Sequence, residues 1–134
     1  MQKLKMKKID KELMQDFLEK NEYVRHIPKS MICYGCYEEN EKKELVGVVG
    51  LYKIAWHMTE IRCLCVKKDQ RQKGIGKFIV SECLEKIDTP LIAAVVEKNN
   101  TPSLKIFQGL GFKIVETFFN KETGHYLHLM LKSQ

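Results

Sequence analysis

The chain is most informative between Thr59 and Val96, where it reads TEIRCLCVKKDQRQKGIGKFIVSECLEKIDTPLIAAVV. Residues 59–66 have the composition of a strand, and apolar residues then recur at helical spacing from Ile75 to Ile87. Leu91 to Val96 is apolar without interruption, as in a strand that is covered on both faces. We therefore predict a strand, a helix and a second strand, and a crossover of this kind makes the two strands parallel.

The sequence on either side of this crossover predicts further elements of both kinds. These are a strand over 1–9, a helix capped by Asp10, a segment over 21–29 that is irregular or a short helix, strands over 31–37 and 45–55, a helix that Thr101 caps and Gly111 ends, and strands over 113–119 and 125–131. No repeat, linker or shift of composition divides the chain. The order predicts α and β elements mixed in one sheet.

Length and composition exclude several classes of protein. A chain of 134 residues is long enough to bury a core without metal or disulfide support, and 44% hydrophobic with 30% charged residues is ordinary for a globular domain. The longest apolar run, Leu91 to Val96, is too short for a membrane span, and the basic N-terminus lacks the apolar stretch of a secretory signal. We expect one domain over residues 1–134, cytoplasmic, with no membrane partner.

The net charge and the cysteines limit the kinds of partner and site that the chain can have. A net charge of +6 fits a nucleic acid or an anionic small molecule as partner. The densest patch of basic residues lies within residues 67–77. Cys33 and Cys36 form C-x-x-C, but in a strand they point to opposite faces, and no second pair completes a metal site. Cys63 and Cys65 share a face. We predict separate buried thiols and no metal.

A basic loop separates the predicted strand from the predicted helix and reads Arg71-Gln72-Lys73-Gly74-Ile75-Gly76-Lys77. Glycines at the start of a helix let the backbone approach a ligand closely, and the free amides of the first turn carry the positive end of the helix dipole. The loop has neither the G-x-x-x-x-G-K-[ST] nor the G-x-G-x-x-G pattern. It predicts a phosphate site, the alternative being a glycine-softened loop with solvated charges.

Two blocks of sequence carry a resemblance to a known family. Arg71-x-x-Gly74-x-Gly76 after a strand resembles the R-x-x-G-x-G/A acetyl-CoA motif of the GNAT superfamily of N-acetyltransferases. Asn100, with Phe107 seven residues later and then Gly111-Phe112, resembles that family's N-x-x-x-x-x-x-Y-x-x-x-G-F block. The resemblance implies a single α/β domain with a mixed, mostly antiparallel sheet of six to seven strands, a central splayed parallel pair and about four flanking helices.

The resemblance also implies the reaction and the binding of its cosubstrate. The reaction would transfer an acetyl group from acetyl-CoA to a primary amine by direct attack in a ternary complex. The backbone of Leu64, Cys65 and Val66 would hold the pantetheine arm, with Asn100 on its other side. The pyrophosphate would lie on the motif loop, which contributes Arg71, Gln72, Lys73, Gly74, Ile75, Gly76 and Lys77.

The chemistry then requires a base more than an acid. An amine of pKa about 10.4 is neutral in only about 4 of 10,000 molecules at pH 7, which costs about 4.6 kcal/mol. A thiol of pKa near 8.5 leaves as thiolate for about 2 kcal/mol. Glu60 resembles the acidic strand residue that serves as base, directly or through water, in the protein-lysine acetylating members of the family. By alternation we expect it to share a face with Arg62, Leu64 and Val66. The alternative is that Glu60 only pairs with Arg62 or faces solvent.

Phe107 departs from the family pattern, in which a tyrosine protonates the leaving thiol. Phenylalanine cannot donate, so we expect Phe107 to pack against the thioester, with Tyr126 or Ser103 as substitute donors. A backbone amide at Leu64 or Cys65 would meet the oxyanion. His57 is a second candidate base.

The acceptor site in such folds is built from three segments. Here they contribute Glu22, Tyr23, Arg25, His26, Trp56, His57, Phe118, Phe119, His125 and Tyr126. Aromatic and mixed charged residues favour a polar amine with an apolar body, a small molecule or amino acid before a peptide or protein. Two other functions are a catalytically silent acyl-CoA sensor and a nucleic-acid-binding module. The sequence contains no recognised nucleic-acid-binding motif, so we expect no nucleic-acid partner. The oligomeric state is expected to be a monomer or homodimer.

Overall fold

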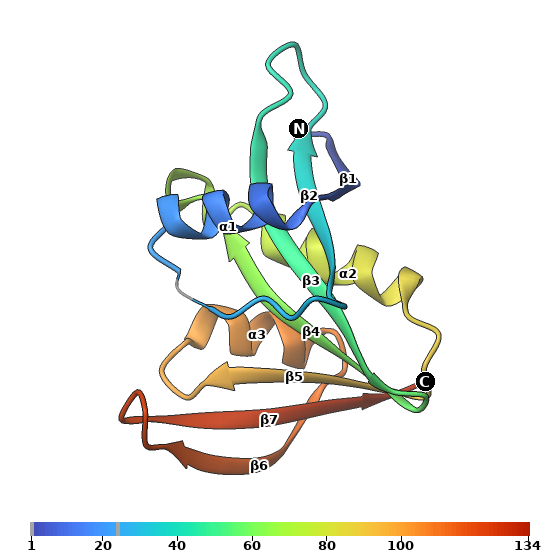
Figure 1. Cartoon of the computed structure of the whole chain (residues 1–134), viewed down its shortest axis with the longest axis vertical. Helices are drawn as coiled ribbons and strands as arrows, with labels where there is room; N and C mark the ends of the chain where they lie inside the picture. Colours follow the sequence, from blue (N-terminus) through green and yellow to red (C-terminus); the bar gives the residue numbers. More distant parts are fainter. Residues whose placement is uncertain (1, 24) are drawn as a thin grey trace.

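The computed structural model describes residues 2–23 and 25–134 and forms one seven-stranded sheet in the order β1-β2-β3-β4-β5-β7-β6 (Figure 1). The strands are β1 (Leu4–Ile9), β2 (Ile32–Glu38), β3 (Leu45–Ala55), β4 (Met58–Val66), β5 (Leu91–Glu97), β6 (Lys113–Asn120) and β7 (His125–Ser133). Among these strands β4 and β5 pair in parallel, and the other neighbours are antiparallel. The predicted mixed, mostly antiparallel sheet is confirmed.

The described residues contain three α-helices where about four were expected. They are α1 (Lys11–Lys20), α2 (Ile75–Lys86) and α3 (Thr101–Gly109), and a single 3₁₀ turn, η1 (Lys68–Gln70), follows β4. Residues 21–23 and 25–31 form no helix, and Pro28 in this segment has no amide to donate to one. Met1 and Val24, which fall in the predicted strand 1–9 and the predicted segment 21–29, lie outside the described residues. In the described part of the chain, no helix combines the length and apolarity that a membrane crossing requires.

The helices divide the core into two clusters on opposite faces of the sheet (Figure 1). The cluster beneath α1 consists of Met14, Phe17, Leu18, Met31, Cys33, Val48, Cys63 and Cys65. The cluster on the other face is built around α2 and includes Phe107 and Phe112 at α3. Cys33 and Cys36 belong to different clusters and Cys63 and Cys65 to the same one, so both predictions about strand faces are confirmed. The five cysteines are buried free thiols.

A β-bulge interrupts β4 in its second half. Gly50 pairs with Arg62 and Val48 with Cys65, so β4 advances three residues while β3 advances two, and Cys63 takes a φ of 57°. An extra residue reverses the alternation of side chains beyond it. Leu64 and Val66 therefore pack toward the α2 face, as Ile61 does.

The expectation that Glu60, Arg62, Leu64 and Val66 share one face is wrong because of this bulge. Glu60 and Arg62 alternate with the buried Ile61 and so face the α1 side, together with Cys63 and Cys65. The face of β4 toward α1 therefore carries its charged side chains, and beyond the bulge the face toward α2 continues with apolar ones.

The parallel pair opens into a V, as predicted. β4 and β5 are paired only from Met58–Leu91 to Ile61–Ala94, whereas β5 stays paired with β7 as far as Glu97–Leu127. Beyond Ile61 the two strands diverge (Figure 1). Their facing backbone groups are left unpaired with one another, which creates a gap in the middle of the sheet.

Candidate active site

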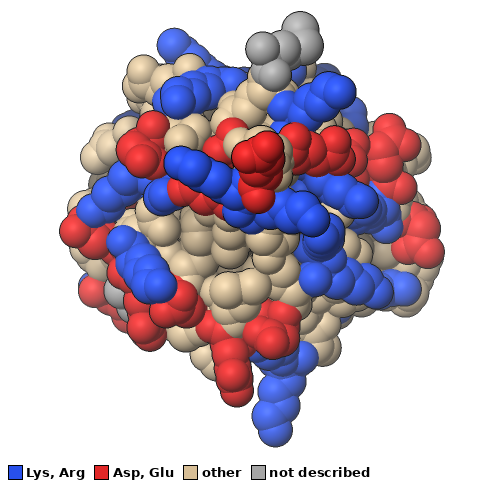
Figure 2. Space-filling view, turned by 90° about the horizontal axis from the view of Figure 1, so that it is seen from above, with Lys and Arg blue, Asp and Glu red and all other residues tan. Residues whose placement is uncertain are grey.

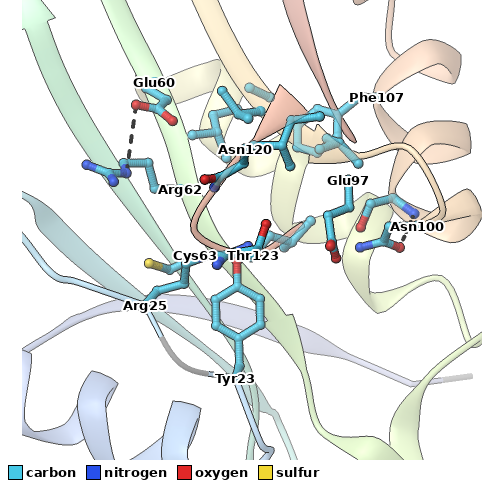
Figure 3. A pocket seen from close by; sticks show the side chains of 17 residues that line it. Tyr23, Arg25, Glu60, Arg62, Cys63, Glu97, Asn100, Phe107, Asn120 and Thr123 are labelled. Carbon is cyan, nitrogen blue, oxygen red and sulfur yellow. Dashed lines mark hydrogen bonds and ion pairs between the residues drawn. The ribbon is translucent and has the colours of Figure 1, made fainter. Parts of the chain in front are cut away.

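A cleft of about 420 Å³ occupies the gap between β4 and β5 and reaches both faces of the sheet (Figure 3). On the α2 face it is lined by Ile61, Leu64, Ala94, Val96, Asn100, Ser103 and Phe107. On the α1 face it is lined by Tyr23, Arg25, Glu60, Arg62, Cys63, Val95 and Glu97, and the β6–β7 hairpin adds Asn120, Thr123 and Leu127. The cleft is therefore mostly apolar on one face and charged on the other.

The loop from Arg71 to Lys77 lies at the open end of the V and presents free backbone amides. The first hydrogen bond of α2 runs from the Phe78 amide to the Gly74 carbonyl, and within the described residues no acceptor is found for the amides of 72–77. Arg71 Nε donates to the carbonyl oxygen of Val66 at 3.0 Å, which ties the loop to the end of β4. Unpaired amides at the start of a helix are the ordinary setting for a bound phosphate.

The two glycines of this loop have different roles. Gly74 caps α2 with a φ of 84°, and a Cβ added there would meet no atom within 4 Å. Gly76 is buried, and its added Cβ would lie 2.8 Å from Ile106 Cδ1. Gly74 therefore leaves the loop open on its outer side, whereas Gly76 lets α2 approach α3.

The surface charge is mixed rather than segregated. Figure 2 shows Lys and Arg side chains interleaved with Asp and Glu side chains on one face of the molecule. Within the basic stretch, Lys67 pairs with Glu44, and Lys68 lies 2.7 Å from a carboxylate oxygen of Glu22. Part of the positive charge near the loop is thus already neutralised.

Asn100 and Phe107 lie on the α2 face of the cleft (Figure 3). The N-cap of α3 is Asn100 rather than Thr101, because Asn100 Oδ1 accepts from the Ser103 amide at 3.3 Å and Thr101 is already helical. Phe107 is 3% exposed and packs edge to face on Phe112 with ring centroids 5.1 Å apart. Of the two substitute donors, Ser103 lines the cleft, whereas Tyr126 is half exposed outside it.

Glu60 is a half-buried carboxylate on the α1 face. Its side chain is 18% exposed, and Arg62 Nε lies 3.7 Å from Glu60 Oε1. Burial raises the pKa of Glu60, and the Arg62 guanidinium opposes that rise. His57 does not line the cleft: it lies in the β3–β4 turn, where its Nδ1 is buried without a hydrogen-bond partner among the described residues.

The family of the chain follows from sequence comparison. The profile of the acetyltransferase (GNAT) family matches residues 4–112, which is most of the chain. The chain belongs to the GNAT family. Members of this family are typically acetyl-CoA-dependent enzymes, and the residues that carry the resemblance lie within the matched region.

Solved structures with the GNAT fold superpose over nearly the whole chain. A GNAT acetyltransferase from Elizabethkingia anophelis with acetyl-CoA bound gives a TM-score of 0.75 at 16% identity, over 98% of each chain. Mutant forms of the spermidine/spermine N-acetyltransferase SpeG from Vibrio cholerae give 0.78 at 14% identity, over 98% of this chain and 95% of that one. Arabidopsis thaliana NAA60 with a bisubstrate analogue gives 0.78 at 12% identity, over 98% of each chain. At these identities the likeness shows the fold.

One curated relative shares more sequence but is a longer protein. The UPF0157 protein YqkA of Bacillus subtilis (strain 168) is 32% identical over 97 residues, which are 72% of this chain and 27% of that protein. The GNAT chain thus spans about a quarter of the length of this relative.

The predicted acceptor residues of this GNAT chain are only partly brought together. Tyr23 and Arg25 line the cleft. The others, Glu22, His26, Trp56, His57, Phe118, Phe119, His125 and Tyr126, do not line it. The β3–β4 turn with Trp56 and His57 adjoins the closed end of the V, where Met58 is still in the paired part of β4. A loop at that end is separated from the gap by paired backbone.

Sequence reasoning missed several residues on the α1 face of the cleft. They are Cys63, Val95, Glu97, Asn120, Thr123 and Leu127, and Arg62 was considered only as a partner of Glu60. Alternation along β5 places Val95 and Glu97 on the same face as Ala93, which pairs with Glu60, so this signal was present in the sequence. The bulge that turns Cys63 to this face had no such signal.

Proposed function

We propose that the protein transfers an acetyl group from acetyl-CoA to a primary amine by direct attack in a ternary complex. The observation that carries this proposal is the cleft through the sheet, which has free amides at its open end and a half-buried carboxylate on the opposite face from α2. A similar fold in Elizabethkingia anophelis binds acetyl-CoA, and one in Vibrio cholerae is a spermidine/spermine N-acetyltransferase. The five free thiols suit a reducing compartment, so we place the reaction in the cytoplasm.

The residues of the open end fit coenzyme A. The amides of 72–77 would bind the pyrophosphate, and the open, positive-φ position of Gly74 leaves room for it. The unpaired edge of β4 at Leu64, Cys65 and Val66 would hold the pantetheine amides, with Asn100 across the gap. Acetyl-CoA supplies a thioester, whose acetyl carbon is the electrophile.

Glu60 is proposed as the base that removes the proton from the amine. Deprotonating a lysine-like amine at pH 7 costs about 4.6 kcal/mol, which is the larger of the two proton costs. A carboxylate whose pKa is raised by burial accepts a proton more readily than an exposed one. Phe107 offers no proton, and the thiolate leaves without one for about 2 kcal/mol.

Two measurements test the proposal, binding of coenzyme A by calorimetry and release of free thiol from acetyl-CoA. Thiol release should depend on an added amine, supplied as a set of small amines, amino acids and short peptides. Binding without release under any condition would instead indicate a silent acyl-CoA sensor, for which the absence of a donor at Phe107 is the specific observation. Preferred acetylation of a peptide would indicate a protein lysine or N-terminal acetyltransferase.

A matched pair of glycine variants tests the loop. Gly74→Ala places a methyl group where the pyrophosphate is proposed to lie. Gly124→Ala is the control, because it adds a methyl group at another open glycine, which has a φ of 75° and lies in the β6–β7 turn. Both substitutions strain the backbone alike. We expect Gly74→Ala alone to weaken coenzyme A binding, by about tenfold or more; equal affinities in the two variants would count against the loop.

A further inference from the structure

The charged groups on the α1 face of the cleft are unequally paired. Glu60 lies 3.7 Å from Arg62 Nε, and Glu97 Oε1 lies 3.6 Å from His125 Nδ1. Arg25 lines the same cleft, and no carboxylate in residues 2–23 and 25–134 lies within 4 Å of its guanidinium. Among the described residues, Arg25 is therefore a cation of this face without a carboxylate partner.

Arg25 is held at this place by an aromatic ring. Its guanidinium carbon lies 5.3 Å from the ring centroid of Tyr23, which is itself partly buried beside the cleft. A cation–π contact of this kind favours the position of the guanidinium beside the ring, and a guanidinium carries five N–H donors. Arg62 differs, because it is engaged by both Glu60 and the ring of Tyr52.

Arg25 and Glu60 both lie near a third residue. Burial raises the pKa of the Cys63 thiol, the charges of Arg62 and Arg25 lower it, and the charge of Glu60 raises it. Cys63 lies on the bulge of β4 and lines the cleft between them (Figure 3). A small ligand above Cys63 would thus have a carboxylate on one side and a guanidinium on the other.

We propose that the acceptor amine also carries a carboxylate, as a free amino acid does, and that Arg25 binds this carboxylate while the amine faces Glu60. This inference rests on the function proposed above. A guanidinium binds a carboxylate with two parallel hydrogen bonds, and few other groups use that geometry. Val95, which is 40% exposed, and Leu127 line the same side of the cleft and suit an apolar side chain. A polycationic amine has no carboxylate for Arg25 to bind.

The test compares acceptors that differ only in the anion. Leucine, leucinamide and 3-methylbutylamine share an apolar body, and phenylalanine with its amide repeats the comparison. We expect the amino acids to have KM values lower by about tenfold or more, although the amide has the less basic amine. Equal or better use of the amides, of 3-methylbutylamine or of spermidine would overturn the inference and leave the proposed function standing.

Variants of Arg25 locate the effect. Arg25→Gln should raise KM for leucine roughly 10- to 100-fold, the range expected for loss of a charge-assisted hydrogen bond, with kcat and the KM for leucinamide little changed. Arg25→Lys should recover part of the loss. Lys29→Gln removes the same charge from the same segment outside the cleft and should leave both KM values unchanged. A loss of the same size for leucine and leucinamide would contradict binding of the carboxylate.

Failure of the proposed function would give a different result. If no amine releases thiol, calorimetry with leucine and the protein saturated with coenzyme A still tests the inference. Binding of leucine that Arg25→Gln abolishes would support a carboxylate site without catalysis. An absence of binding for every amino acid in the set would overturn the inference as well.

Discussion

Replacement of Glu60 by glutamine tests the proposed base most directly. Glutamine has nearly the same shape as glutamate but cannot accept a proton at neutral pH, and Glu60 is only 18% exposed, so the variant changes little else in the cleft. Among the described residues, the 3.7 Å contact with Arg62 is the one ion pair that it removes. Any change in rate therefore reports on the carboxylate.

The size of the effect follows from the state of the amine. Without a base, the enzyme must wait for the roughly 4 in 10,000 amines that are neutral at pH 7, a fraction that grows tenfold with each pH unit up to about pH 10. A positioned base contributes about 10²–10⁴ in rate. We therefore expect Glu60→Gln to lower kcat/KM about 100-fold at pH 7, with the deficit shrinking to about tenfold at pH 8 and becoming small at pH 9.

In a plot of activity against pH, the native protein should also show a fall at low pH, caused by protonation of Glu60, that the variant lacks. Because burial raises the pKa of Glu60, the carboxyl becomes protonated at a higher pH than an exposed glutamate, and activity falls as pH decreases through that raised pKa. A raised pKa in the folded state also means that any stability Glu60 contributes is present at low pH and lost as pH rises through the raised value. Glu60→Gln should therefore not lower the Tm at pH 7.

The assay is thiol release at saturating acetyl-CoA between pH 6 and 9, with the acceptor found in the amine screen. Glu97→Gln is the comparison, since Glu97 is the other carboxylate lining the cleft and pairs with His125 instead. Any loss in Glu97→Gln should not vary with pH in the same way. A Glu60→Gln deficit of constant size from pH 7 to 9 would refute the role of Glu60 as base.

Two further variants test other parts of the site. Phe107→Tyr restores the hydroxyl typical of the family. Because departure of the thiolate costs only about 2 kcal/mol, kcat measured at pH 7 should change less than about tenfold. A rise above 100-fold would mean that protonation of the leaving group limits the rate of the native protein. Gly76→Val overfills the space beside Ile106, whose Cδ1 lies 2.8 Å from an added Cβ, and should lower the free energy of unfolding by about 1–3 kcal/mol. In urea titrations the double variant Gly76→Val with Ile106→Ala should lose less than the sum of the single variants, and strict additivity would mean that the two residues do not touch.

The loop and the crossover were readable from sequence because their signals are local. The spacing from Ile75 to Ile87, the uninterrupted run from Leu91 to Val96 and the two loop glycines depend on neighbours within a few residues. The same holds for Asp10, whose Oδ1 caps α1 by accepting from the Leu13 amide at 2.8 Å. Local reasoning failed by one residue at α3, where Asn100 and Thr101 are both good caps and only the geometry selects between them.

The faces of the strands could not be read in the same way. The alternation of β4 is reversed after Arg62 by a bulge, which lies where the register with β3 shifts between Val48 and Gly50. Beyond it, Cys63 and Cys65 are buried beneath α1 and Leu64 packs toward α2. Which side chains of β4 are buried on which face depends on packing against residues far away in the chain. The spacing of residues within β4 does not reveal this packing.

The amino-acid sequence by itself therefore determined the order of elements, the amide-rich loop and the family, since each of these is encoded in short-range patterns. Only the tertiary structure decided which side chains face the gap between β4 and β5. It excluded the Trp56–His57 turn, because paired strands close that end of the V, and of the predicted residues after α1 it placed only Tyr23 and Arg25 at the cleft. The loop proposed to bind the cosubstrate is a local motif, whereas the proposed acceptor site is an assembly of four separate segments whose positions depend on the packing of the whole sheet.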